Sequence, residues 1–136
     1  MKIAADANVL LSAILGGRAR LVLEHPQIEA ALTTDHTFSE VEEYAPILAV
    51  KKRLSPDRLL LAVAALGVTI VDRGQYAKSM AQAARLISHR DPEDIELLAL
   101  ALHLRIPIWS NDKDFDNLPV PRFSTEGMLR HLRIIG

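Results

Sequence analysis

Two kinds of hydrophobic pattern alternate along the chain. Short apolar or β-branched runs predict strands at residues 2–5, 30–34, 68–71 and 106–109, with an edge strand at 118–123. Between them, apolar residues at helical spacing predict helices at residues 8–15, 19–24, 37 to at least 48, 55–66, 76–88, 91–104 and 125–132. Strands that alternate with helices are typical of α/β domains. The pattern therefore predicts one domain over residues 1–136 with a mostly parallel central sheet.

Proline and capping residues mark several helix ends. Ser55 followed by Pro56 is a strong helix start, and Gly67 ends that helix. Pro46 lies inside the helical pattern that begins at Thr37, which predicts a kink or a break at that point.

The composition is that of a folded domain. The 136 residues are 49% hydrophobic and carry a formal net charge of −1, which argues against disorder and against a protein that coats nucleic acid without specificity. The absence of cysteine excludes a disulfide scaffold, a thiolate zinc site and a cysteine nucleophile, and it fits a reducing, cytoplasmic setting. We expect no signal peptide, because the apolar stretch at the N-terminus reaches a carboxylate, Asp6, after three residues. We expect no membrane span either, because the longest apolar run, at residues 59–71, is too short.

Four acidic residues fall at related places in these predicted elements. Asp6 follows the first strand, Asp112 follows the strand at 106–109, and Asp94 and Glu40 lie in the first turns of two helices. Ligands of open parallel sheets bind at the carboxyl ends of the strands, so these acids are expected to converge. Carboxylates gathered in a small space need a cation, and their hard oxygens suit Mg²⁺ or Mn²⁺. Such a site would activate water for attack on a phosphate.

Each acid also has a purely structural interpretation, and the sequence leaves both open. Asp6 can cap the helix that follows it, and Thr37 with Glu40 matches a capping box. Asp91 before Pro92 is a natural N-cap, which Asp94 could complete. In favour of a functional role, the helix after Asp94 is apolar nearly all round, and a carboxylate on a buried face needs a partner.

The order of these segments resembles the PIN-domain ribonucleases, including the VapC-like toxin nucleases. Asp-Ala-Asn-Val-Leu-Leu-Ser-Ala at residues 6–13 is similar to the opening of that family, and Ser-Glu-Val at 39–41 is weakly similar to its second acidic segment. Residues 90–94 with 98–102 resemble its third acidic segment, and residues 108–115 resemble its fourth. The resemblance implies a three-layer α/β/α sandwich and Mg²⁺- or Mn²⁺-dependent cleavage of RNA. It also implies a role as the toxin of a toxin–antitoxin pair.

The resemblance also assigns roles to individual residues. It implies that the catalytic and metal-binding set is Asp6, Glu40, Asp94 and Asp112. Glu43, one turn beyond Glu40, could serve instead of it. Supporting roles, in orienting carboxylates or water or in adding ligands, fall to Asn8, Asp91, Ser110 and Asp114. Many relatives have Thr in place of Ser110, a change that keeps the hydroxyl group.

The expected partners are implied mainly by the family resemblance. It implies an RNA substrate and a small antitoxin protein that binds over the acidic crevice. It also implies a homodimer, whose interface could be the apolar helix at 59–66, although this helix could equally belong to the core. Basic residues that could contact phosphate are Arg18, Arg20, Lys51, Lys52, Arg53, Arg58 and Arg90. For residues 51–53, a solvated helix end is the favoured interpretation. The five histidines form no HExxH-type pair, so core or solvated roles are expected.

Three other functions fit the sequence less well than this one. A phosphatase of the haloacid dehalogenase type needs a second aspartate where Asn8 stands, and a receiver domain needs an early acidic pair that is absent. The stronger alternative is a catalytically inactive PIN-fold module that binds RNA or protein. A full acidic set argues against it, because clustered carboxylates repel one another without a cation.

Overall fold

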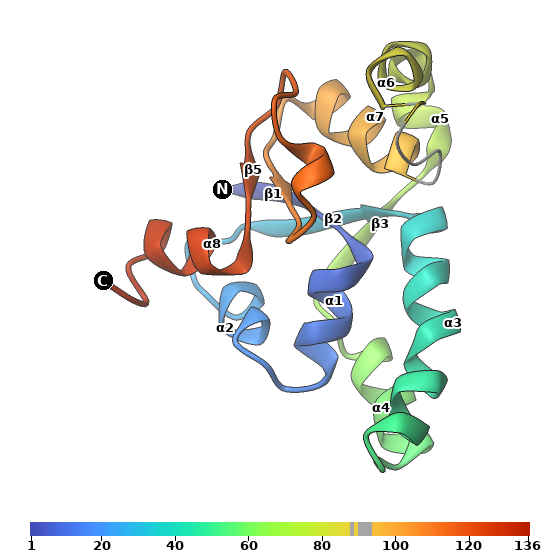
Figure 1. Cartoon of the computed structure of the whole chain (residues 1–136), viewed down its shortest axis with the longest axis vertical. Coiled ribbons are helices and arrows are strands. Elements are labelled where there is room, and N and C mark those ends of the chain that lie inside the picture. The colour runs from blue at the N-terminus through green and yellow to red at the C-terminus, as the bar shows by residue number, and fades with distance from the viewer. Residues whose placement is uncertain (88, 90–93) are drawn as a thin grey trace.

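The computed structural model describes residues 1–87, 89 and 94–136. Within these residues, five strands form one all-parallel sheet in the order β3-β2-β1-β4-β5 (Figure 1). The strands are β1 (Lys2–Ala5), β2 (Ala30–Thr34), β3 (Val68–Val71), β4 (Ile108–Trp109) and β5 (Arg122–Phe123). The predicted α/β fold with a mostly parallel central sheet is confirmed.

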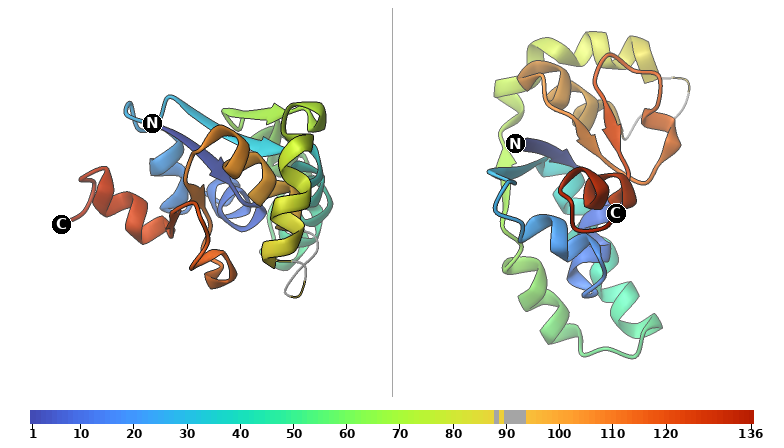
Figure 2. Two further views of the ribbon diagram at one scale, coloured as in Figure 1. Left: turned by 90° about the horizontal axis from the view of Figure 1, so that it is seen from above. Right: turned by 90° about the vertical axis from the view of Figure 1, so that its left-hand side faces the viewer.

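Helical segments connect the strands and cover both faces of the sheet. The α-helices are α1 (Ala7–Ile14), α2 (Ala19–Leu23), α3 (Asp35–Lys51), α4 (Pro56–Ala64), α5 (Arg73–Tyr76), α6 (Met80–Ile87), α7 (Ile95–Leu104) and α8 (Thr125–His131). The 3₁₀ segments within the described residues include η1 (Ala77–Ser79) and η3 (Lys113–Phe115). Figures 1 and 2 show α1, α2 and α4 on one side of the sheet and α5, α6 and α7 on the other. The end of α3 and α4 form a helical hairpin that projects away from the sheet (Figures 1 and 2).

The sheet separates two hydrophobic cores. Successive residues of a strand point to opposite faces. Ile3 and Ala5 of β1 accordingly join the core under α1, α3 and α8, whereas Ala4 joins the core under α6 and α7. The sequence of α7 is apolar nearly all round, which predicted burial of this helix. Its residues 97–101 are indeed all buried. Burial of this kind supplies most of the stabilising free energy of the fold, at roughly 25 cal/mol per Å² of apolar surface.

The start of α3 differs from the capping box expected at Thr37 and Glu40. The helix begins at Asp35, and the side chain of Thr34 caps it by accepting a hydrogen bond from the Thr37 backbone amide at 2.9 Å. The Thr37 hydroxyl is buried and accepts a hydrogen bond from the Thr34 hydroxyl. The prediction was wrong because strand β2 runs directly into the helix, so the last strand residue is already the cap. Glu40 therefore lies in the second turn of the helix.

Of the kink or break expected at Pro46, the break does not occur, because α3 continues through this residue. The helix continues to Lys51, and Ala45 and Ala49 are both fully buried against the core. Proline has no backbone N–H, so the helix lacks the hydrogen bond from residue 46 to the Glu42 carbonyl. Pro46 and Glu42 are both exposed, so water can bind that carbonyl instead. Packing of the buried face against the core keeps the helix continuous.

Three other predicted elements have different bounds. The expected helix at 76–88 is divided into α5, η1 and α6, because Tyr76 turns inward to a buried position with φ −111°. Of the expected edge strand at 118–123, only residues 122–123 pair with β4. Pairing of the strand expected at 106–109 is limited to residues 108–109. Among the described residues, no helix has the length and apolar character needed to cross a membrane.

The predicted dimer face at 59–66 is divided between core and surface. Leu59 and Val63 are buried in the core, whereas Leu60 and Leu61 are exposed. The core interpretation is therefore correct for the inner face of α4, and the outer face presents apolar side chains to solvent.

Candidate active site

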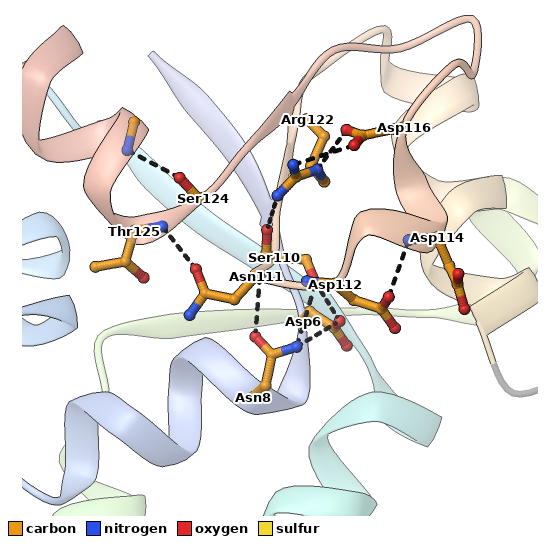
Figure 3. Close-up of polar contacts among 11 residues, drawn as sticks. Asp6, Asn8, Ser110, Asn111, Asp112, Asp114, Asp116, Arg122, Ser124 and Thr125 are labelled. Carbon is orange, nitrogen blue, oxygen red and sulfur yellow. Dashed lines mark hydrogen bonds and ion pairs between the residues drawn. The ribbon is translucent and has the colours of Figure 1, made fainter.

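The site is built where β1 and β4 end side by side. Asp6 directly follows β1 and Ser110 directly follows β4, and the Asp6 amide donates to the Trp109 carbonyl at 3.0 Å. Figure 3 shows Asp6, Ser110 and Asp112 gathered at this edge of the sheet. We call these three residues the acidic edge. The convergence of Asp6 with the loop that carries Asp112 follows from the parallel pairing of the two strands.

The two carboxylate oxygens of Asp6 have different hydrogen-bond partners. Its side chain is buried, with 8% of the residue exposed, and its Oδ1 accepts from the Ala7 amide at 2.8 Å, which caps α1. Its Oδ2 accepts from the Ser110 hydroxyl at 2.6 Å and from the Asn8 amide nitrogen Nδ2 at 3.2 Å. The short distance to Ser110 is that of a charge-assisted hydrogen bond. Both interpretations of Asp6 that the sequence left open are thus compatible, since each uses a different oxygen.

Ser110 links the Asp6 carboxylate to the backbone of Asp112. Its hydroxyl donates to Asp6 and accepts from the Asp112 backbone amide at 3.0 Å. The Asp112 carboxylate accepts from the Asp114 amide at 2.9 Å and so caps η3. Ser110 is fully buried, so this hydroxyl has no water to exchange its partners with. The Ser110 side chain therefore contacts the Asp6 carboxylate and the start of the loop that carries Asp112.

Two asparagines extend this network to the next helix. Asn8 Nδ2 donates to the Ser110 hydroxyl at 3.3 Å, and its Oδ1 accepts from the Asn111 amide at 3.3 Å. Asn111 Oδ1 in turn accepts from the Thr125 amide at the start of α8, at 2.8 Å (Figure 3). Asn111 was not among the predicted residues. Its only sequence signal is its place between Ser110 and Asp112.

Arg122 also was not predicted, although it supports the loop of the acidic edge. Its guanidinium makes two hydrogen bonds to the Asp116 carboxylate, at 2.6 and 3.3 Å, and a third to the Ser110 carbonyl at 3.0 Å. The Arg122 side chain is only 15% exposed. No local pattern could have identified this pair, because its members lie in a loop and in a strand whose pairing depends on the whole sheet.

The other two predicted acids lie on helical segments: Glu40 belongs to α3 and Asp94 immediately precedes α7. Glu40 Oε1 lies 3.6 Å from His36 Nε2, one turn earlier on α3, and Glu40 is partly buried, whereas Glu43 is exposed. Asp94 precedes α7, and its side chain makes no capping hydrogen bond to that helix. Exposure thus favours Glu40 over Glu43 as the second acid.

A second polar cluster lies beside Glu40. Glu96 of α7 accepts from the Tyr76 hydroxyl at 2.9 Å, and it lies 3.4 Å from Arg73 Nε and 3.9 Å from His36 Nδ1. Burial, and then the hydrogen bond to Glu96, raise the pKa of the Tyr76 phenol above its usual value, so it stays a hydrogen-bond donor at neutral pH. His36 connects this cluster to Glu40, and the i to i+4 spacing of the two residues was the one sequence signal for it.

Comparison with known proteins decides the family. A family model described as "PIN domain" matches residues 4–133. The chain belongs to the PIN-domain family. The comparison of its sequence with curated proteins gave no match.

Solved structures resemble this PIN domain in fold. A toxin–antitoxin complex from Klebsiella pneumoniae matches 90% of this chain and 97% of its own, at 19% identity and a TM-score of 0.64. VapBC2 from Rickettsia felis, bound to a promoter DNA fragment, covers 91% of this chain and 98% of its own, at 11% identity and a TM-score of 0.62. DNA-bound VapBC from Salmonella typhimurium covers 92% and 98%, at 17% identity and a TM-score of 0.61. At these identities, the similarity concerns the fold.

The side chains at the acidic edge can be compared with the ligands that a divalent metal ion requires. The acidic edge offers carboxylate oxygens, the ligands that Mg²⁺ and Mn²⁺ prefer, held by a hydroxyl and an amide at a buried position. In kind, these donors fit such an ion. Among the described residues, however, no group of three or more histidine, aspartate or glutamate side chains is already arranged to hold a metal ion. Asp6 and Asp112 are brought together, and the contribution of Glu40 and Asp94 stays a prediction.

The remaining predicted residues lie around this centre or outside the described chain. Asp114 is exposed, and its backbone amide donates to the Asp112 carboxylate. Arg18 and Arg20 are exposed at the start of α2, at the opposite end of α1 from Asp6. Arg90 and Asp91, and with them the expected cap before Pro92, lie outside the described residues.

Proposed function

We propose that this PIN domain is a divalent-metal-dependent endoribonuclease of the cytoplasm. The observation that supports the proposal most is the single buried hydroxyl of Ser110, which joins the Asp6 carboxylate and the Asp112 backbone. Burial of the Asp6 carboxylate beside the Asp112 loop is costly for a purely structural loop, whereas a metal-dependent phosphodiesterase uses such carboxylates to hold its ion.

Each residue of the site has a distinct task in this proposal. Asp6 and Asp112, with Asp94 and Glu40, would hold Mg²⁺ or Mn²⁺. When bound, such an ion makes water a stronger nucleophile at neutral pH and neutralises charge that develops on the phosphate oxygens. Ser110 and Asn8 fix the Asp6 carboxylate, which keeps its second oxygen directed away from the helix that it caps. No histidine is required as a base.

The toxin role is a narrower part of the same proposal. The similar structures are described as toxin–antitoxin or VapBC assemblies, one of them from Klebsiella pneumoniae. We extend that role to this chain, with a small antitoxin protein that covers the acidic edge and neutralises its carboxylates. A basic side chain would suit this place, since the edge presents several acids at the ends of neighbouring strands.

Cleavage of a mixed RNA pool tests the proposal. The wild type, Asp6→Asn and Asp94→Asn are compared in Mn²⁺, in Mg²⁺ and in EDTA, with Asp57→Asn as the control because Asp57 is an exposed acid of α4. We expect cleavage in either metal, none in EDTA, and a loss of at least about 100-fold in both site variants. Asp57→Asn should retain the wild-type rate.

If no RNA is cut, either the RNA target is missing from the pool or the protein has no active metal site. Calorimetric titration with Mn²⁺ distinguishes these two explanations. An active site whose RNA target is missing from the pool would still bind Mn²⁺ in the wild type and lose it in Asp6→Asn. A folded wild type that neither cuts RNA nor binds Mn²⁺ would contradict the proposal and favour an inactive PIN-fold module.

A further inference from the structure

A cavity lies at the end of α1 that is farthest from Asp6. It has a volume of about 410 Å³, and its rim carries three arginines from separate segments: Arg20 of α2, Arg53 after α3 and Arg58 of α4. Its floor is apolar, with Ile14 of α1 and Leu59 of α4 among the lining residues. We call it the arginine pocket. Figures 1 and 2 show that the end of α1 lies between α2 and the turn that joins α3 to α4.

The charges of the arginine pocket favour an anionic ligand. None of its lining residues that the structure describes is acidic. Within the described residues, Arg53 and Arg58 form no ion pair, whereas Arg20 pairs with Glu24 at 2.9 Å. All three arginines are exposed. A planar guanidinium binds phosphate oxygens through two parallel hydrogen bonds, which makes arginine well suited to phosphate recognition.

The shape of the arginine pocket suits a nucleotide more than a bare phosphate. Its volume lies within the range of roughly 300–1,000 Å³ that is typical of small-ligand sites. An apolar floor under a charged rim matches a ligand with one flat apolar face and one anionic group. A neighbouring cavity of about 300 Å³ shares Ile14, Arg20 and Ala62 with it, so the apolar surface continues toward α2.

The exposed face of α1 joins the arginine pocket to the acidic edge. Along this helix, Asn8, Leu11, Ser12 and Leu15 are the residues with exposed or partly exposed side chains. Their spacing of three and four places them on one face. Asn8 belongs to the site, and Leu15 lines the arginine pocket. Eight helical residues span about 12 Å at 1.5 Å each. That length corresponds to roughly three or four stacked nucleotides at ~3.4 Å each.

We propose that the arginine pocket is a nucleotide-binding subsite for single-stranded RNA. It holds a base against its apolar floor and the adjoining phosphates on Arg53 and Arg58, a few nucleotides from the bond that is cut at the acidic edge. That the bound RNA is also the substrate rests on the proposed ribonuclease function. That RNA binds in the pocket is argued from the charges and shape of the pocket and does not depend on that function.

Binding of a labelled single-stranded RNA of about eight nucleotides, long enough to span α1, tests the inference. Fluorescence anisotropy is measured in the Asp6→Asn background, so that the RNA is not cut. The test variant is Arg53→Gln/Arg58→Gln, which removes both positive charges and keeps a polar, hydrogen-bonding side chain at each position. The control is Lys78→Gln/Arg85→Gln, which removes the same charge from two exposed residues of η1 and α6 on the other side of the sheet.

We expect the test variant to bind at least about tenfold more weakly than the control, because two phosphate contacts are lost. The slope of log K against log salt should fall by about 1.4, since each contact on a single strand contributes about 0.7. Ala62→Phe fills the pocket without a change of charge. It should weaken binding and leave the salt slope unchanged.

A test variant that binds RNA as well as the control does would overturn the inference. If that variant had also lost binding of a poly-glutamate peptide, the surface would be assigned to an acidic protein partner instead. Failure of the nuclease proposal is seen separately, as an absence of cleavage and of Mn²⁺ binding by the wild type, with the anisotropy results unaffected.

Discussion

The acidic edge and the arginine pocket lie at opposite ends of α1 and are built in opposite ways. At the acidic edge, the buried Asp6 and Ser110 are joined by a hydrogen bond of 2.6 Å between neighbouring strands. At the arginine pocket, exposed Arg53 and Arg58 lie on loops and helix starts, beside exposed apolar residues of the α3–α4 hairpin.

This difference shows how one short helix can separate chemistry from recognition. Polar groups that must act in a fixed geometry are held by buried hydrogen bonds, because a low dielectric strengthens them and packing prevents their movement. Groups that bind a flexible chain can remain exposed, since long arginine side chains adjust to the phosphates that they meet. The exposed large apolar residues of α3, α4 and the turn between them are Tyr44, Ile47, Val50, Leu54, Leu60 and Leu61, of which Leu54 lines the pocket. Surfaces of this kind mark interaction sites in proteins.

The largest expected effect tests the division of α4 into a core face and a surface face. Leu59→Ala should lower the free energy of unfolding by about 3 kcal/mol, because Leu59 is 4% exposed and the substitution leaves a cavity. Leu61→Ala should change it by less than about 0.5 kcal/mol, since Leu61 is 70% exposed. Denaturant unfolding measures both. Equal losses would show that α4 buries its outer face as well, for example between two copies of the chain.

The second prediction compares two ion pairs of different burial. Arg122→Ala should cost about 2 kcal/mol of stability, because it removes charge-assisted hydrogen bonds to Asp116 and to the Ser110 carbonyl. Arg130→Ala removes an exposed pair with Glu126 at 2.7 Å and should cost about 0.3–0.5 kcal/mol. Thermal unfolding of the two variants gives the difference. Similar values would show that Arg122 does not support the loop of the acidic edge.

A third prediction concerns the hydroxyl at the centre of the acidic edge. Ser110→Ala should reduce the rate of RNA cleavage and the affinity for Mn²⁺ by roughly 10–100-fold, the usual cost of losing a group that orients a metal ligand. Ser110→Thr keeps the hydroxyl and should restore most of the activity. Mn²⁺ calorimetry and cleavage assays are compared with thermal stability. A loss of stability without a change in Mn²⁺ affinity would assign Ser110 a structural role only.

The smallest effect is a pH dependence at the cluster beside the acidic edge. Tyr76→Phe should lower stability at neutral pH by about 1 kcal/mol, the net value of one hydrogen bond. The pKa of folded Tyr76 is raised above its ordinary value of 10.0, so above that pH the unfolded chain releases a proton that the folded chain retains. The contribution of Tyr76 is therefore complete below about pH 10 and is lost as the pH rises further. Urea unfolding from pH 8 to pH 11 should show a shallower alkaline decline for Tyr76→Phe than for the wild type, and parallel curves would contradict this origin of the decline.

Much of the fold could be predicted from local sequence patterns. The β1 and β2 strands match their predicted bounds, because short apolar runs between turn residues have few alternatives. The start of α4 at Pro56 with its Ser55 cap was predicted for the same local reason. The start of α3 was not, because Thr34 serves as the last residue of a strand and as a helix cap at once.

For the site, the sequence determined which chemistry is available and which strands carry it. Acids after strands, in an order similar to that of PIN-domain ribonucleases, pointed to the edge at which Asp6 and Asp112 are found. The tertiary structure alone decided that one buried serine hydroxyl joins them, since Asp6 and Ser110 are 104 residues apart in the chain. It likewise decided that Arg20, Arg53 and Arg58 surround one cavity. The reason is physical: the spacing of residues along a helix or strand is local, whereas the distance between two side chains depends on how every element between them packs.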